Sequence, residues 1–91
     1  MATVAVRHRV ADFDAWKVVY DEHGAVRKEH GTIGDTVLRD AADPNEVLVL
    51  TTWPTLAEAK AFADDPSLPE AMAKGGVIGA PRIEFYEEAG I

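Results

Sequence analysis

The chain has 91 residues, of which 47% are hydrophobic and 27% charged, with a formal net charge of −7 and no cysteine. This length and composition predict one domain over residues 1–91, with no disulfide scaffold, no thiolate nucleophile and no cysteine metal site. The negative charge argues against nucleic acid or an anionic membrane as partner, and the lack of a long apolar run or a signal-peptide pattern favours the cytoplasm.

The first predicted element is a strand over residues 3–10, where the side chains alternate with a period of two. One face of this strand carries Val4, Val6, His8 and Val10, and the other carries Ala5, Arg7 and Arg9. We expect the apolar face, with its single histidine, to contact the core.

Residues 13–30 predict an amphipathic helix, which Asp12 can cap and Gly31 can end. At 100° per residue, an arc of about 140° holds the inward side chains. These are Phe13, Trp16, Val19, Tyr20, His23, Val26, Arg27 and His30. His23 lies at the centre of the arc, and two interpretations stay open. It is either a hydrogen-bonded core histidine or a base in a ligand pocket floored by Trp16 and Tyr20.

Two strands and a helix follow. Residues 33–40 predict a rather polar strand, and residues 46–53 predict a central strand because they are apolar on both faces. Thr55 and Glu58 form a capping box that opens a second helix. The inward side chains of that helix are Leu56, Ala59, Phe62 and Ala63.

The last third of the chain predicts a short helix and a final strand. After a break at residues 64–66, Ser67 opens a short helix, and we interpret this serine as its cap. Residues 75–81 read as a glycine-rich loop, which is either a mobile lid or a helix terminator. Residues 82–88 alternate as a closing strand.

This order predicts the ferredoxin-like α+β fold, βαββαβ, with a four-stranded antiparallel sheet and the helices on one face. We expect the first and third strands to lie side by side and parallel at the centre, which would bring His8 and Trp53 to one edge of the sheet. Arg82 and Trp16 would reach the same edge. Whether Trp53 lines a pocket there or only fills the end of the core stays open.

The face of the sheet away from the helices is also apolar. If Val47, Val49 and Thr51 face the helices, then Leu48, Leu50 and Thr52 face away, and the reverse orientation leaves a similar apolar surface uncovered. A domain of this size rarely leaves such a surface in water. We therefore expect a homodimer that pairs two sheets through this open face, as in a dimeric α+β barrel.

Several features resemble the small dimeric α+β barrel proteins. They are Trp16-Lys17, His23, the strand ending at Trp53, Ser67-Leu-Pro-Glu70 and the closing Arg82-Ile-Glu-Phe-Tyr86. Within that group the chain is most similar to the antibiotic biosynthesis monooxygenase-like branch, whose members are often labelled monooxygenase or cyclase. The resemblance extends over nearly the whole chain.

The resemblance implies oxidation of a small aromatic or polyketide-like molecule, often without a metal or flavin, in a pocket between the sheet and the helices. Polyketide cyclisation or isomerisation is one alternative, and a non-catalytic ligand-binding or accessory dimer is another. On the first interpretation His23 is the catalytic base, and Arg82 or Arg27 holds developing negative charge. The remaining predicted substrate-binding residues are His8, Trp16, Tyr20, Trp53 and Tyr86.

Other catalytic motifs are missing from the sequence. One related branch binds haem through a histidine on its second helix, but residues 55–74 contain none. The three histidines lack metal-ligand spacing, and the glycines at 75–79 are not followed by the GK[ST] of a phosphate loop. We therefore expect no metal and no cofactor.

Overall fold

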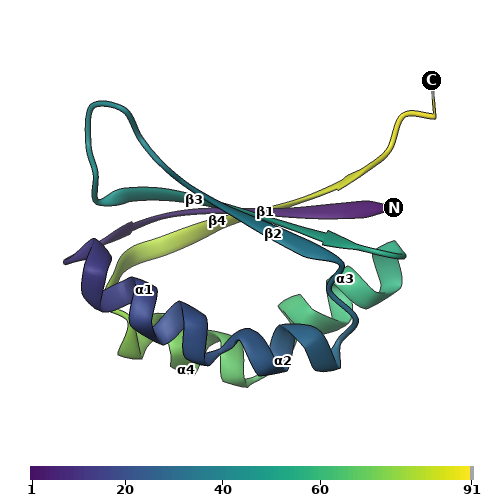
Figure 1. The fold of residues 1–91 in the computed structure, drawn as a ribbon, viewed down its shortest axis with the longest axis horizontal. Helices are drawn as coiled ribbons and strands as arrows, with labels where there is room; N and C mark the ends of the chain where they lie inside the picture. Colours follow the sequence, from purple (N-terminus) through teal and green to yellow (C-terminus); the bar gives the residue numbers. More distant parts are fainter. Residues whose placement is uncertain (91) are drawn as a thin grey trace.

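A computed structural model describes residues 1–90 of the chain. The elements in chain order are β1 (Ala2–Val10), α1 (Phe13–Glu22), α2 (Gly24–Glu29), β2 (Gly34–Arg39), β3 (Glu46–Trp53), α3 (Leu56–Ala63), α4 (Ser67–Lys74) and β4 (Val77–Glu87). One antiparallel sheet with the strand order β2-β3-β1-β4 forms the first layer, and the helices form a second layer against one of its faces (Figure 1). The predicted ferredoxin-like α+β fold is confirmed. Within the described part of the chain, no helix has the length and apolar character needed to cross a membrane.

The two central strands run antiparallel, so the prediction that they are parallel was wrong. Their register pairs Ala2 with Trp53 and His8 with Val47. His8 and Trp53 therefore lie near opposite ends of the sheet and not at one edge. The reason is topological: the helical crossover makes β2 parallel to β1, and β3 then folds back on β2 as a hairpin, so β3 opposes β1.

The core lies between the sheet and the helices. The predicted alternation of β1 is present, because its valines and His8 are buried while Arg7 and Arg9 are exposed. The core side chains come from both layers: Val4, Val6, Val10, Val47, Val49, Trp53, Trp16, Ala59 and Phe62. Burying an aliphatic side chain of this kind stabilises the fold by about 1.5–3 kcal/mol.

The predicted helix over residues 13–30 is two helices, with His23 at the break. Asp12 caps α1 by accepting a hydrogen bond from the Asp14 backbone N–H, and Gly31 follows α2 with φ of +96°, as predicted. Around the break the Val26 N–H donates to the carbonyl of His23, three residues earlier. Gly24 follows His23 directly and is the first residue of α2, so His23 alone separates the two helices.

The prediction of a glycine-rich loop over residues 75–81 was wrong for most of its length. Gly75 and Gly76 do end α4, but β4 begins at Val77 and pairs with β1 from Val10 onward. The register shifts between Arg7 and Arg9 of β1, and Gly79 lies opposite this irregularity with φ of +76°. A bulge of this type needs a positive φ, which is why glycine occupies a strand here.

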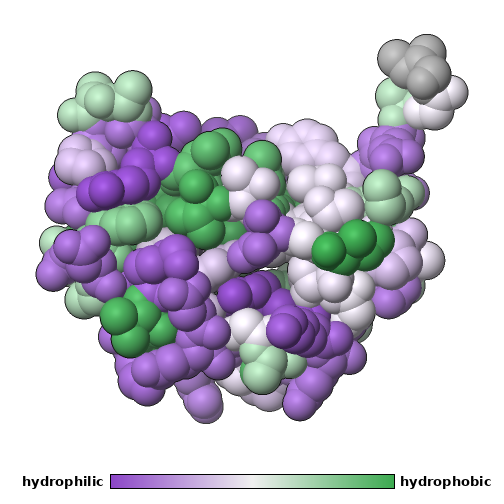
Figure 2. All heavy atoms as spheres, viewed as in Figure 1, coloured by the Kyte–Doolittle hydropathy of each residue, from purple (hydrophilic) through white to green (hydrophobic). Residues whose placement is uncertain are grey.

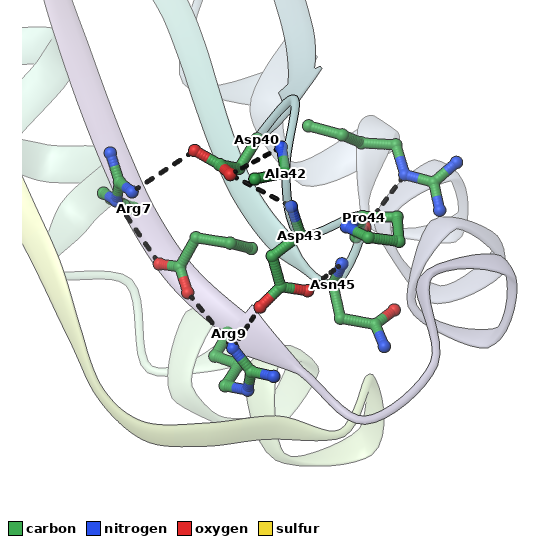
Figure 3. Close-up of polar contacts among 9 residues, drawn as sticks. Arg7, Arg9, Asp40, Ala42, Asp43, Pro44 and Asn45 are labelled. Carbon is green, nitrogen blue, oxygen red and sulfur yellow. Dashed lines mark hydrogen bonds and ion pairs between the residues drawn. The ribbon is translucent and has the colours of Figure 1, made fainter.

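The open face of the sheet combines an apolar centre with an ion-pair network at one end. Leu48 and Leu50 point to this face, which is one of the two orientations that the sequence left open. At the end near the β2–β3 turn, Arg7 pairs with Glu46 and Asp40, and Arg9 pairs with Glu46 and Asp43 (Figure 3). The helical layer is by contrast covered mostly by hydrophilic side chains in the view of Figure 2.

Candidate functional site

A cavity lies between the helices and the middle of the sheet, where the sequence predicts a pocket. Its own volume is about 50 Å³, and the space that includes its open mouth is about 500 Å³. A cavity of 50 Å³ can hold water but is smaller than a typical small-molecule site, so an aromatic ligand enters only if the walls move apart. Its wall is mainly apolar, and its polar members are His8, Tyr20, His23, Arg27 and Thr51. None of the described residues that line it is acidic.

His8 points from β1 into this cavity and is only 5% exposed. Its ring packs edge-on against Trp16, with 5.4 Å between the ring centroids. Both ring nitrogens are buried and have no hydrogen-bond partner among the described residues. Burial lowers the pKa of His8, so the ring is neutral at pH 7. A buried polar group without a partner costs about 1–3 kcal/mol, which makes His8 a candidate contact for a ligand.

Arg27 brings a buried positive charge to the cavity. It is 7% exposed, and its guanidinium carbon lies 3.7 Å from the centroid of the Tyr20 ring. Its Nη2 donates a hydrogen bond of 2.9 Å to the backbone carbonyl of Tyr20. No carboxylate of residues 1–90 lies within 4 Å of the guanidinium, although buried charges are normally paired.

Tyr20 supports Arg27 and is not itself a base. Its hydroxyl donates a hydrogen bond of 2.5 Å to Asp35 Oδ2. Burial, together with this hydrogen bond to Asp35, raises the pKa of Tyr20 far above its usual value. The phenol therefore stays protonated, and Arg27 is the cationic group of the cavity.

His23 has a hydrogen-bond partner and also lines the cavity, so both of its predicted interpretations stay open. It lines the cavity from the junction of α1 and α2, and its Nε2 lies 2.8 Å from Ser67 Oγ. Burial lowers its pKa, and the neighbouring Arg27 lowers it further, so the ring is neutral at pH 7. His23 also borders a shallow groove on the outside of α1 and α4, and thus lies at the mouth of the cavity.

Ser67 does not cap α4, which corrects the prediction. The N-cap residue is Pro66, which makes no side-chain capping hydrogen bond. The Ser67 backbone N–H instead donates to Asp65 Oδ1 at 2.8 Å, and the Ser67 hydroxyl contacts His23. The contact with His23 spans 44 residues of sequence, so no local pattern could have revealed it.

A second pair joins α2 to the turn before α4. His30 Nε2 lies 2.7 Å from Asp65 Oδ2, and the His30 ring packs edge-on against Phe62. The hydrogen bond from His30 holds the pKa of Asp65 well below its usual range. The sequence placed His30 on the inward arc but gave no sign of its partner.

The structure brings His8, Trp16, Tyr20, His23 and Arg27 together around the cavity. It places the other predicted site residues elsewhere. Trp53 is fully buried, donates from Nε1 to Thr51 Oγ1 at 2.9 Å and stacks on Phe62 with 5.0 Å between the ring centroids. Trp53 therefore fills the core and does not line the cavity, which was the alternative interpretation.

Arg82 and Tyr86 lie on the open face of the sheet, so the expected position of Arg82 at the pocket was wrong. In β4, Arg82 is opposite Arg7 and Tyr86 is opposite Thr3, and opposed residues share a face. Arg82 pairs with Glu84 at 3.0 Å. The prediction failed because β4 begins at Val77, five residues earlier than the first strand residue that alternation suggested.

Helix α4 contributes a wall of the cavity that was not predicted from the sequence. Leu68, Ala71 and Met72 cover the cavity from this helix. Their spacing of three and four residues is the signal that could have found them. Among residues 1–90, no group of three or more potential ligand side chains is placed to hold a metal ion.

Comparison with known proteins gives a family match and similar folds. The family model described as antibiotic biosynthesis monooxygenase matches residues 4–74. SnoaB, a cofactor-independent oxygenase from Streptomyces nogalater, superposes with a TM-score of 0.78 at 13% identity over 99% of this chain and 94% of SnoaB. No curated protein matches the sequence of this chain.

Two further solved structures are named as candidate antibiotic biosynthesis monooxygenases. The one from Deinococcus radiodurans has a TM-score of 0.74 at 17% identity, over 100% of this chain and 95% of its own. The one from Caulobacter crescentus has a TM-score of 0.76 at 19% identity, over 97% and 89%. At these identities the structural likeness shows the fold.

Proposed function

This chain belongs to the antibiotic biosynthesis monooxygenase family, and we propose that it is a cofactor-independent monooxygenase acting on a small aromatic or polyketide-type molecule. One observation carries the proposal. The apolar cavity holds a neutral, unpartnered histidine, His8, and a buried guanidinium without a carboxylate, Arg27. Direct reaction of an electron-rich aromatic with O2 needs a base, an apolar environment and stabilisation of negative charge. The cavity offers all three.

The proposed reaction converts an activated CH2 group of the substrate into a carbonyl. A histidine removes one proton, and the resulting carbanion, delocalised over the aromatic system, reacts with O2 to form a peroxide anion. The protonated histidine returns its proton and gives a hydroperoxide. Loss of water from the hydroperoxide leaves the ketone, so one oxygen atom enters the product and the other leaves as water. Arg27 stabilises the negative charge that spreads over the substrate oxygen.

Two residues are candidates for the base, and we favour His8. Its ring nitrogens have no other partner, so one lone pair is available to a substrate in the cavity. His23, the base expected from the sequence, has its Nε2 occupied by Ser67 and lies at the mouth. We therefore assign His23 a role in closing the cavity, and keep it as the second candidate base.

Anthrone tests the proposal, because its CH2 group is acidified by a conjugated carbonyl. We expect O2 uptake above the rate with heat-unfolded protein, with one O2 consumed for each anthraquinone formed. Equal rates with native and unfolded protein would contradict oxygenase activity on this substrate class. Conversion of anthrone to its enol tautomer without O2 uptake would indicate the isomerase alternative. Binding without any turnover would indicate the non-catalytic alternative.

We also propose that the protein is a homodimer joined through the open face of the sheet. Leu48 and Leu50 of β3 point outward at the centre of that face. Leu38 of the neighbouring β2 is 44% exposed beside them. A contiguous apolar surface of this kind supports pairing with a second copy.

A further inference from the structure

We propose that the ligand of the cavity is an aromatic molecule that already carries an oxyanion when it binds, and that Arg27 pairs with this oxyanion. The proposal rests on the function proposed above, in which the cavity holds an aromatic substrate. It goes further because it names the charge of that substrate before any proton is removed.

The guanidinium of Arg27 is held in place for such a contact. One face lies 3.7 Å from the centroid of the Tyr20 ring, and Nη2 bonds to the Tyr20 carbonyl. The Arg27 carbonyl accepts hydrogen bonds from the backbone N–H and the hydroxyl of Thr32, which fixes the end of α2. Arginine has five N–H donors, and the contact with Tyr20 uses one of them. The remaining donors can bind the two oxygens of a carboxylate together or donate to the single oxygen of a phenolate.

Gly24 gives the guanidinium its room. A Cβ at this position would lie 3.3 Å from Nη2 of Arg27, closer than ordinary van der Waals contact. The residue that follows the break between α1 and α2 therefore permits the position of the charge.

No side chain of the described cavity wall neutralises Arg27. The lining residues include no aspartate or glutamate. The nearby Asp35 accepts the hydroxyl of Tyr20, and Asp65 is engaged by His30 and Ser67. A cation in such an apolar environment interacts with an anion far more strongly than it would in water.

The net charge of −7 does not prevent an anion from entering. The acidic residues are mainly on the exposed surface, and at physiological ionic strength their field is screened over about 8 Å. The contact with Arg27 inside the cavity is screened much less. The preference for an anion is therefore a local property of the cavity.

The side chains along one wall of the cavity form a row that a bound ligand would contact. The His8 ring contacts Trp16, the Trp16 ring stacks on Tyr20 at 5.0 Å, and the Tyr20 ring stacks on Arg27. An aromatic ring lying along this wall can place its oxyanion at Arg27 and a polar group toward His8. A neutral apolar ligand would leave both of these buried groups unpartnered, which is costly for the charged one above all.

Three naphthalenes test the charge preference: 1-naphthoate, its neutral isostere 1-naphthamide, and the ionised phenol 2,4-dinitro-1-naphtholate. Binding is measured at pH 7.5 by the quenching of tryptophan fluorescence, since Trp16 lines the cavity. We expect at least one of the two anions to bind 10-fold or more tightly than the amide, a difference of about 1.4 kcal/mol. Whichever anion shows the preference identifies the oxyanion as a carboxylate or a phenolate.

Variants of two arginines test which of them causes the preference for anionic ligands. Arg27→Met should abolish it, whereas Arg27→Lys, which keeps the charge, should retain part of it. The matched control Arg82→Met should leave it unchanged, because Arg82 lies on the open face of the sheet. If Arg27→Met does not fold, the proposal is still tested by the relative affinities of the wild-type protein for the anions and the amide, and by the reduced preference expected of Arg27→Lys.

The proposal is overturned if wild-type protein binds the amide as tightly as both anions, if it binds none of the three, or if a folded Arg27→Met retains the preference. Oxygen uptake with anthrone is a separate measurement. A protein that prefers the anions but consumes no O2 would contradict the proposed oxygenase function and leave the anion site standing.

Discussion

His23 and Ser67 join the break between α1 and α2 to the first turn of α4, through a contact of 2.8 Å between His23 Nε2 and Ser67 Oγ. Helix α4 has no fully buried side chain, yet it forms one wall of the cavity. Its position depends on partly buried side chains, Leu68 and Met72, and on polar contacts at its ends, of which this is one. The lowered pKa of His23 keeps the ring neutral, so its Nε2 can accept the hydroxyl proton of Ser67 at pH 7.

Removing the hydroxyl of Ser67 should loosen α4 without destroying the site. Ser67→Ala is expected to lower the free energy of unfolding by about 0.5–1.5 kcal/mol, the usual contribution of one hydrogen bond. His23→Ala should cost a similar amount or more, because it also removes the packing of the ring against Phe62. Urea denaturation of the two single variants and the double variant measures their coupling. Strictly additive effects would contradict a direct interaction between these side chains.

Substitutions of His8 are expected to change turnover without lowering the melting temperature. Replacing its buried, unpartnered ring with the apolar side chain in His8→Leu is expected to leave the melting temperature unchanged or to raise it. The same change should abolish turnover, and His8→Gln should lower kcat/KM for O2 uptake by about 10²- to 10⁴-fold, the usual contribution of a general base. If His23→Ala loses this activity while His8→Gln keeps it, the role of base belongs to His23.

The stability of the protein should fall as the pH drops below 7. Burial lowers the pKa values of His8 and His23 in the folded state, whereas an unfolded histidine titrates near pH 6.5. Below about pH 6.5 the unfolded state then binds more protons than the folded one, so acid favours unfolding. Asp65 does not titrate in this range, because its pKa lies far lower.

Urea denaturation between pH 8 and pH 5 measures this dependence. The His8 contribution is the difference between wild-type protein and His8→Gln, which should change below pH 6.5 and stay constant above pH 7. A difference that is independent of pH would show that His8 titrates normally in the folded protein.

Gly75 is expected to be intolerant of a side chain even though its φ of −78° is ordinary. A Cβ there would lie 3.0 Å from Trp16 Cδ1 and 3.2 Å from the Ala71 carbonyl oxygen. Gly75→Ala should therefore displace Trp16 at the cavity wall and lower the free energy of unfolding by about 1–3 kcal/mol, as overpacking does. Gly34→Ala is the matched control, since a Cβ there meets nothing within 4 Å. Similar melting temperatures for the two variants would contradict the close packing of α4 on Trp16.

Local periodicity predicted the strands well because alternation reports directly on burial. The bounds predicted for β3 coincide with those observed, and the residues of β1 face the sides that their alternation indicates. Contacts between segments that are distant in the sequence leave no periodic pattern that would predict them. The pairs His23–Ser67 and His30–Asp65 depend on how the helices cross, which the sequence did not reveal.

The misplaced site residues have a different cause. Arg82 was assigned to the cavity through the start of a strand, but β4 extends further toward the N-terminus because Gly79 forms a bulge within it. Trp53 was assigned through the direction of β3, which the crossover and hairpin together reverse. Strand direction follows from topology alone, so this second error could have been avoided from the predicted element order.

The open face of the sheet leads to a prediction about assembly. Light scattering at micromolar concentration should give twice the chain mass of 9.8 kDa. Leu50 points to the open face, so Leu50→Asp should dissociate the dimer and leave a folded monomer, because a charge at the centre of an apolar interface would be buried without a partner. Val49, 4% exposed, faces the helices, so Val49→Asp should unfold the chain itself. A wild-type mass of one chain would contradict the homodimer, and an unfolded Leu50→Asp variant would show that the open face is needed for folding.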